Sequence, residues 1–196
     1  MTDSTAHAAT PPEAHWLNVP NALTALRMVL VPVFAWVLLS HPHDDSWRWG
    51  AALIFVFASI TDIVDGKVAR RYGLVTRFGK LWDPIADKAL TGMALVGLSI
   101  IGELAWWITV VILVREWGIT LLRFLILKYG VMAANRGGKL KTVTQSVAIV
   151  MYLLPLPEWL HAAGVVVMWV ALVLTVLTGI DYCWEAWKLR KKALEA

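Results

Sequence analysis

Cysteine and charge are both scarce in this chain of 196 residues. Cys183 is the one cysteine, which excludes an internal disulfide and any metal site built from several cysteines. Charged residues make up only 16% of the sequence, whereas a soluble domain carries about 25%. The composition therefore argues against a soluble globular protein.

Apolar residues dominate instead. The chain is 59% hydrophobic with a mean hydropathy of +0.64, and its 12 tryptophans are of a type that favours membrane–water interfaces. The net charge of +4 is too small to argue for nucleic acid as a partner. These features predict a polytopic membrane protein.

Six apolar segments can be marked out as membrane-crossing helices, with a crossing length of about 20 residues as the guide. The predicted fold class is all-α, with six transmembrane helices, short connections and no internal repeat. The approximate segments are Pro20–Leu39, Trp49–Ala69, Pro84–Ile101, Ala105–Leu127, Leu140–Leu154 and Trp159–Trp184.

The two ends of the chain are polar. Residues 1–15, MTDSTAHAATPPEAH, lack the basic segment and adjacent apolar core of a cleaved signal peptide, so we expect a disordered tail there. Residues 190–196 are expected to form a basic C-terminal tail. The six helices then occupy one transmembrane domain, residues 16–189.

Lysine and arginine follow every second apolar segment. The other connections hold one arginine, Arg48. Because positive loops stay in the cytoplasm, both termini should be cytoplasmic, in a multi-pass protein of the cell membrane. The basic positions are Lys67, Arg70, Arg71, Arg77 and Lys80, then Lys128, Arg136, Lys139 and Lys141, then Lys188, Arg190, Lys191 and Lys192.

Four aspartates gather between the second and third segments, in DIVDGKVARRYGLVTRFGKLWDPIAD. Asp62 and Asp65 are three residues apart, and Asp83 and Asp87 are four apart, so each pair shares one face of a helix. If the two faces meet, four carboxylates converge at the cytoplasmic end of the bundle.

Four carboxylates at the end of a membrane-spanning bundle need positive charge to compensate them. Oxygen ligands without His or Cys favour a hard divalent ion, Mg²⁺ or Mn²⁺. Two such ions could be bridged by four carboxylates and hold a pyrophosphate, with Arg70 pairing with phosphate oxygens. The alternative is a solvated cytoplasmic loop whose acids pair with its own Arg and Lys.

The spacing of eight residues resembles the signature of the CDP-alcohol phosphatidyltransferase family. Those residues are Asp62, Asp65, Gly66, Ala69 and Arg70, followed after eight further positions by Gly79, Asp83 and Asp87. Six helices with cytoplasmic termini also fit this family. Its members use divalent metals and displace CMP from a CDP-linked lipid with an alcohol hydroxyl.

The resemblance implies a role for each signature position. Asp62, Asp65 and Asp83 are expected to be metal ligands, with Asp83 bridging two ions. Asp87 is expected to be the general base for the attacking hydroxyl and to touch the second metal. The remaining positions and nearby polar residues are assigned to the CDP-lipid pocket: Gly66, Ala69, Arg70, Gly79, Asn21, Thr24 and Thr76.

Further polar residues interrupt other apolar segments and are functional candidates for that reason. They are Asn21, Thr24 and Arg27 in the first segment, Arg115, Glu116 and Arg123 in the fourth, and Lys139, Lys141, Thr142 and Gln145 at the start of the fifth.

Four of these cations are not needed to compensate the charge of the aspartates. We hypothesise that Arg115, Arg123, Lys139 and Lys141 hold the phosphate of a phosphorylated acceptor. Two simpler interpretations stay open: an ion pair between Arg115 and Glu116, and cytoplasmic anchoring by the two lysines.

Segments along the chain resemble, in order, family members that join CDP-diacylglycerol to glycerol 3-phosphate: NVPNALTALRMVLVP, REW, GKLKTVTQ and LTGIDYCWEAWKLR. An inositol-phosphate acceptor is the nearest alternative, because it also needs a phosphate pocket. The resemblance further implies a homodimer. Remoter alternatives are a UbiA-like prenyltransferase, which also binds pyrophosphate through Mg²⁺, and a small cation transporter.

Overall fold

The structure is a computed structural model that describes residues 19–72, 77–126 and 136–195. Side chains are described for these ranges except at positions 19–20, 65–66, 68–72, 77–81, 136 and 192–195.

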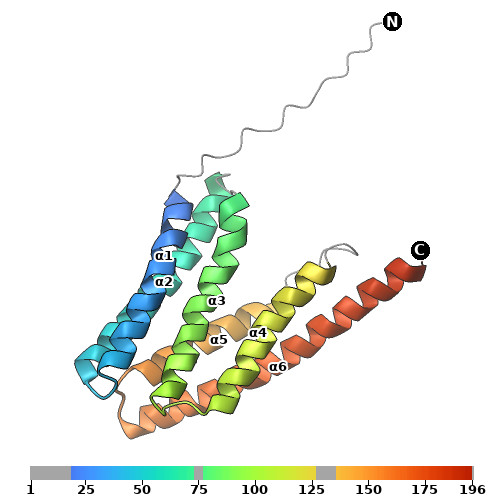
Figure 1. Cartoon of the computed structure of the whole chain (residues 1–196). Helices are drawn as coiled ribbons and strands as arrows, with labels where there is room; N and C mark the ends of the chain where they lie inside the picture. The colour runs from blue at the N-terminus through green and yellow to red at the C-terminus, as the bar shows by residue number, and fades with distance from the viewer. Residues whose placement is uncertain (1–18, 73–76, 127–135, 196) are drawn as a thin grey trace, which may run out of the picture.

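Six helices make up the described part of the chain, which contains no strand, so the all-α prediction is confirmed (Figure 1). The predicted segments fall within or close to these helices. The helices are α1 Val19–Ser40, α2 Asp45–Tyr72, α3 Arg77–Ile100, α4 Trp106–Ile126, α5 Arg136–Leu153 and α6 Glu158–Glu195.

Two of the helices continue well past one end of the apolar segment from which they were predicted. α3 begins at Arg77 rather than near Pro84, and α6 continues to Glu195, through the predicted basic tail. Hydropathy detects only the part of a helix that avoids water, and the polar turns that continue the helix are not detected. At about 1.5 Å per residue, the 38 residues of α6 span roughly 57 Å, longer than the ~30 Å apolar layer of a bilayer.

Helix ends at one end of the bundle carry recognisable caps. The Asp44 carboxylate accepts a hydrogen bond from the backbone N–H of Ser46 at 2.8 Å, which caps the start of α2. Gly102 has φ +83°, and the backbone N–H of Glu103 donates to the carbonyl of Leu98 at 3.0 Å, closing α3 with a Schellman turn. These caps keep the connections short.

Arg48 ties three elements together at the same end. Its Nη1 lies 2.5 Å from Glu103 Oε1, its Nη2 donates to the Tyr152 carbonyl at 2.5 Å, and its Nε donates to the Leu153 carbonyl at 3.1 Å. Arg48, the one basic residue in the connections that the positive-inside rule would place outside the cytoplasm, therefore joins α2 to the end of α5.

The apolar core lies toward this capped end. α1 packs against α2 and α3, while α6 packs against α4 and α5. Gly97 lets α1 and α3 approach closely, because a Cβ there would lie 2.6 Å from Leu38 Cδ2. The core includes Phe34, Leu38, Phe55, Leu90, Leu95, Leu98, Ile112, Ile149, Leu153 and Met168.

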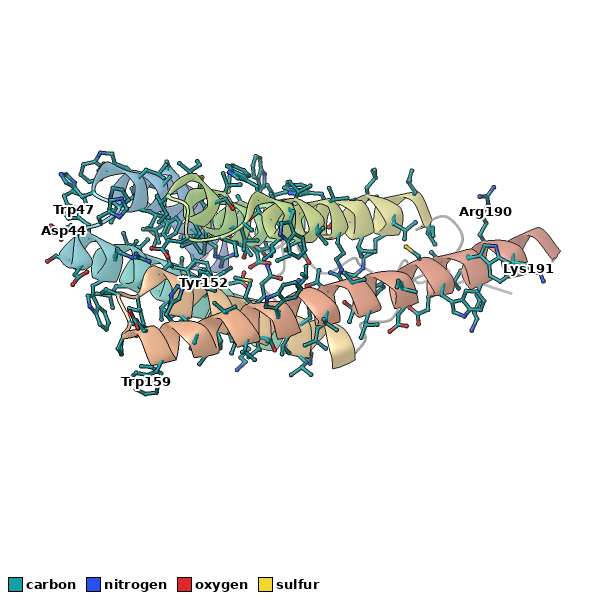
Figure 2. The ribbon with its side chains drawn as sticks, turned by 90° about the horizontal axis from the view of Figure 1, so that it is seen from below. Asp44, Trp47, Tyr152, Trp159, Arg190 and Lys191 are labelled. Atoms are coloured by element: carbon teal, nitrogen blue, oxygen red, sulfur yellow. The ribbon has the colours of Figure 1, made fainter. Side chains whose placement is uncertain are left out.

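The two ends of the bundle differ in chemistry. Figure 2 shows Trp47 and Trp159 at one end and Arg190 and Lys191 at the other. Large apolar side chains are also exposed on all six helices, as expected where a surface faces lipid. The basic end is the one that the positive-inside rule assigns to the cytoplasm, an orientation that stays a prediction.

Within the residues that the structure describes, three helices are long and apolar enough to cross a membrane, over Asn21–Ser40, Asp45–Val64 and Glu158–Lys191. Six spans therefore remain a prediction. The other three helices carry ionisable side chains within their length: Asp83, Asp87 and Lys88 in α3, Arg115, Glu116 and Arg123 in α4, and Lys139 and Lys141 in α5. All of these residues except Asp83 line the cavities described next.

Candidate functional site

A buried arginine of α1 neutralises one aspartate of the signature. Arg27 is 0% exposed, and its Nη1 lies 2.5 Å from Asp62 Oδ1 on α2. Burying a guanidinium is strongly unfavourable unless a carboxylate accompanies it. The pair therefore fixes the position of Asp62 relative to α1.

A second residue of α1 binds the next aspartate. Thr24 Oγ1 donates a hydrogen bond to Asp83 Oδ1 on α3. Thr24 and Arg27 lie on one face of α1 with Asn21, and all three are buried. The first-segment residues selected by sequence thus face the aspartates of α2 and α3.

Asp87 lies where several cavities meet. It lines a small polar cavity of about 30 Å³ between α3, α4 and α5. It also lines an apolar groove of about 370 Å³, together with Asp62. The other walls of that groove are mostly apolar side chains of α2 and α5, including Phe55, Ile60 and Val147. A carboxylate here can act on molecules that arrive from either side.

The donor set at the aspartates fits a hard divalent cation, because every carboxylate presents oxygen ligands alone. Among side chains that the structure describes, no three or more His, Cys, Asp or Glu groups gather closely enough to hold an ion. One of the four expected ligands, Asp65, lies outside those side chains. The metal centre therefore stays a prediction.

Several other predicted residues also lie outside the described set. Thr76 falls in a segment that the structure does not describe, and the side chains of Asp65, Gly66, Ala69, Arg70 and Gly79 are not described although their backbones are helical.

The four cations assigned to an acceptor phosphate line one cavity. Arg115, Arg123, Lys139 and Lys141 border a space of about 580 Å³ that residues of α2 to α6 line. Lys67 and Lys88 line it as well, although sequence analysis assigned neither to this pocket. Lys88 could have been found, because it is an ionisable residue inside an apolar segment next to Asp87.

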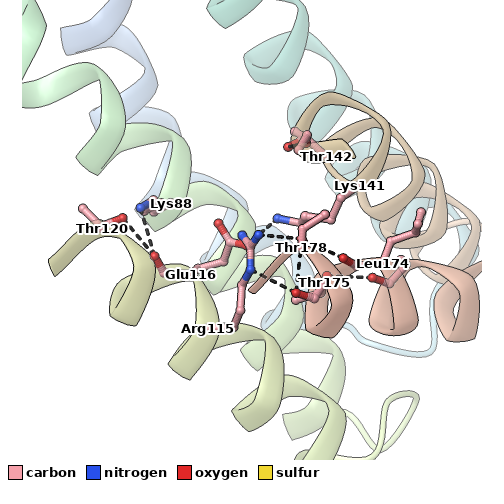
Figure 3. Close-up of polar contacts among 11 residues, drawn as sticks. Lys88, Arg115, Glu116, Thr120, Lys141, Thr142, Leu174, Thr175 and Thr178 are labelled. Carbon is pink, nitrogen blue, oxygen red and sulfur yellow. Dashed lines mark hydrogen bonds and ion pairs between the residues drawn. The ribbon is translucent and has the colours of Figure 1, made fainter. Parts of the chain in front are cut away.

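Glu116 partly neutralises this cavity. Its Oε1 lies 2.8 Å from Arg115 Nη1 and also pairs with Lys141 Nζ, and Figure 3 shows the three side chains together. Lys88 Nζ donates to the Glu116 carbonyl at 3.1 Å. The ion pair that sequence analysis left open is therefore present, within the proposed pocket itself.

Arg115 is fixed by α6 as well as by Glu116. Its Nε donates to the Thr175 carbonyl at 3.1 Å, and its Nη2 donates to Thr178 Oγ1 at 2.6 Å (Figure 3). Gly179 leaves room for the side chain, since a Cβ there would lie 3.2 Å from Arg115 Cγ. Arg115 is consequently held in one orientation along the cavity wall.

Arg123 and Lys139 are less constrained. Both are exposed, and the Arg123 guanidinium lies 4.7 Å from the ring centroid of Tyr182 on α6. Tyr182 itself lines the cavity, a position that sequence analysis did not select. These two cations are thus better placed than Arg115 and Lys141 to meet an incoming anion.

Comparison with known proteins places the chain among lipid-synthesising enzymes. The family model described as CDP-alcohol phosphatidyltransferase matches residues 17–177. A "Probable phosphatidylglycerophosphate synthase" of Mycobacterium tuberculosis (strain ATCC 25618 / H37Rv) is 53% identical over 166 residues, covering 84% of this chain and 79% of that protein.

Two further relatives share a more specific description, "CDP-diacylglycerol--glycerol-3-phosphate 3-phosphatidyltransferase". The Bacillus subtilis (strain 168) protein is 36% identical over 193 residues, covering 89% of this chain and 97% of that protein. The Escherichia coli (strain K12) protein is 37% identical over 171 residues, covering 84% and 92%. The residues matched by the family model include the aspartate signature and the four cations assigned to the acceptor phosphate.

Proposed function

Since the chain belongs to the CDP-alcohol phosphatidyltransferase family, we propose that it transfers a phosphatidyl group from CDP-diacylglycerol to glycerol 3-phosphate. The products are phosphatidylglycerophosphate and CMP. The observation that carries this proposal is the place of Asp87, which borders an apolar groove and lies beside a cation-lined cavity.

The lipid substrate would approach through the apolar groove. Its apolar walls of α2 and α5 suit acyl chains, and Asp62 and Asp87 also line the groove. Hydrophobic burial of the chains would then bring the diphosphate to the aspartates. The CDP-lipid pocket would be completed by Asn21, Thr24, Gly66, Ala69, Arg70, Thr76 and Gly79.

The aspartates would hold the diphosphate through metal ions. Asp62, Asp65, Asp83 and Asp87 would bind two divalent cations, Mg²⁺ or Mn²⁺, which when bound neutralise the diphosphate and stabilise departing CMP. Thr24 fixes one oxygen of Asp83 by hydrogen bonding, and Arg27 limits the charge that Asp62 presents. These contacts orient the carboxylates before substrate arrives.

Asp87 would act as the general base. Its carboxylate takes the proton of the attacking hydroxyl as that oxygen bonds to the phosphatidyl phosphorus, and the bond from this phosphorus to the CMP oxygen breaks. A base must lie within hydrogen-bond reach of the proton that it removes. The small cavity beside Asp87 gives a hydroxyl access to it.

The acceptor phosphate would bind in the 580 Å³ cavity. Arg123 and Lys139 are exposed there, and Arg115 and Lys141 share one carboxylate oxygen, so the cavity wall carries more positive than negative charge. Charge-assisted hydrogen bonds from such cations favour a phosphate over a neutral alcohol. This favours glycerol 3-phosphate over acceptors that carry no phosphate.

Release of CMP tests the proposal. Purified protein in detergent would be mixed with CDP-diacylglycerol, Mg²⁺ or Mn²⁺, and one candidate alcohol at a time. We expect CMP with glycerol 3-phosphate. Absence of CMP with every alcohol would contradict the reaction, whereas CMP with inositol phosphate but not with glycerol 3-phosphate would contradict only the acceptor.

A further inference from the structure

Gln145 of α5 carries a buried oxygen without a hydrogen bond. The residue is 2% exposed, and its Oε1 has no partner among the residues that the structure describes. Buried polar atoms in native proteins are nearly always hydrogen-bonded, and an unsatisfied acceptor destabilises the fold. Such an atom therefore points to a partner that arrives with a ligand.

The position of Gln145 shows which residues would surround such a ligand. It lines the small polar cavity that also contains Asp87, Lys88, Glu116 and Lys141. At about 30 Å³, this cavity has room for water-sized polar groups such as hydroxyls.

The small cavity joins the two larger ones. It shares Asp87 and Ser146 with the apolar groove, and it shares Lys88, Glu116 and Lys141 with the cation-lined cavity. A molecule whose phosphate lies on the cations can extend its other end into this junction, which both Asp87 and Gln145 line.

We propose that Gln145 is a specificity residue that reads the non-reacting hydroxyl of a short phosphorylated polyol. The terminal hydroxyl of the acceptor gives its proton to Asp87, while the middle hydroxyl donates a hydrogen bond to Gln145 Oε1. This inference rests on the proposed function, and it adds the group that distinguishes a diol acceptor from a simple alcohol. A site that hydrogen-bonds a substrate hydroxyl strongly rejects an analogue without it, since the buried acceptor is then left unpaired.

The experiment compares two acceptors on two proteins. Glycerol 3-phosphate has the middle hydroxyl, whereas 3-hydroxypropyl phosphate keeps the phosphate and the terminal hydroxyl and lacks only that group. For the wild-type protein we expect kcat/KM to be about tenfold or more higher with glycerol 3-phosphate. Gln145→Met, which keeps the length of the side chain without its oxygen, should bring the ratio close to one by lowering kcat/KM for glycerol 3-phosphate alone.

Thr144→Val serves as the matched control. Thr144 is the preceding residue on α5, and its Oγ1 donates to the Leu140 carbonyl within the same helix at 2.9 Å. This variant should keep the wild-type ratio. The ratio of the two kcat/KM values for the wild-type protein is measured without any variant. It therefore tests whether the middle hydroxyl is recognised even if Gln145→Met does not fold.

Three outcomes overturn the inference. A wild-type ratio near one would show that the middle hydroxyl is not recognised. An equal loss on both acceptors in Gln145→Met would assign Gln145 a structural role. Absence of CMP with glycerol 3-phosphate in the wild-type protein would contradict the proposed function as well, which separates that failure from the first two.

Discussion

Replacing Arg115 by lysine should destabilise the protein although the positive charge is kept. The guanidinium reaches three acceptors at once: the Thr175 carbonyl at 3.1 Å, Thr178 Oγ1 at 2.6 Å and Glu116 Oε1 at 2.8 Å. An ammonium group cannot reproduce this planar set of donors. Arg115→Lys therefore loses about two of the three contacts.

The size of the effect follows from these contacts. A hydrogen bond to a charged group contributes roughly 1.5–3 kcal/mol, and the Arg115 side chain is 13% exposed, so partial solvation favours the lower end. We expect a loss of about 2–4 kcal/mol. For a protein of this length, that corresponds to a Tm lower by roughly 4–16 °C.

Thermal unfolding in detergent measures the change. Arg123→Lys is the matched control, because Arg123 lies on the same helix and its guanidinium stacks on the Tyr182 ring at 4.7 Å. An exposed cation–π contact contributes only about 0.5–1 kcal/mol, so the control should lower Tm much less. Equal shifts for the two variants would refute the role of Arg115 as a tie between α4 and α6.

Three further substitutions probe the base, the phosphate cavity and the capped end. Asp87→Asn should lower kcat by about 10²–10⁴-fold while CDP-diacylglycerol binding is largely retained, because a carboxamide cannot take the proton. Lys139→Ala should raise the KM for glycerol 3-phosphate roughly threefold to tenfold, and more than the KM for CDP-diacylglycerol, since one cation of the cavity is lost. Arg48→Met should reduce stability by about 2–3 kcal/mol, measured as Tm, without changing either KM, because it leaves Glu103 unpaired at the capped end of the bundle.

Each of these three has an outcome that contradicts it. Loss of lipid binding together with turnover in Asp87→Asn would mean that Asp87 is chiefly a metal ligand. Equal changes in both KM values for Lys139→Ala would argue against an acceptor phosphate at that residue, and Lys191→Ala, near the far end of α6, is the control expected to change neither. A raised KM in Arg48→Met would show that the capped end and the site are coupled.

Local patterns in the sequence were sufficient to predict the family and most of the fold. The eight signature residues from Asp62 to Asp87 can be recognised without knowledge of the packing, and the family that they resemble is confirmed. The apolar segments gave six helices because burial and lipid exposure both select apolar residues. They missed the polar first turns of α3, which hydropathy does not detect.

Contacts between helices could not be predicted from such patterns. The sequence marked Arg115, Glu116 and Lys141 as polar residues in apolar segments, but it could not show that one carboxylate oxygen serves both cations. The pairing of Arg27 with Asp62 likewise depends on how α1 packs against α2. Periodicity within one helix says which residues share a face, and only the packing says what that face meets.

The most direct test follows the acceptor into the lipid product. The protein in detergent would be supplied with CDP-diacylglycerol, a divalent cation and isotope-labelled glycerol 3-phosphate, and both CMP and labelled lipid would be quantified. We expect one labelled phosphatidylglycerophosphate for each CMP released. CMP released without labelled lipid, or no labelled lipid at all, would contradict the transfer of the phosphatidyl group to glycerol 3-phosphate.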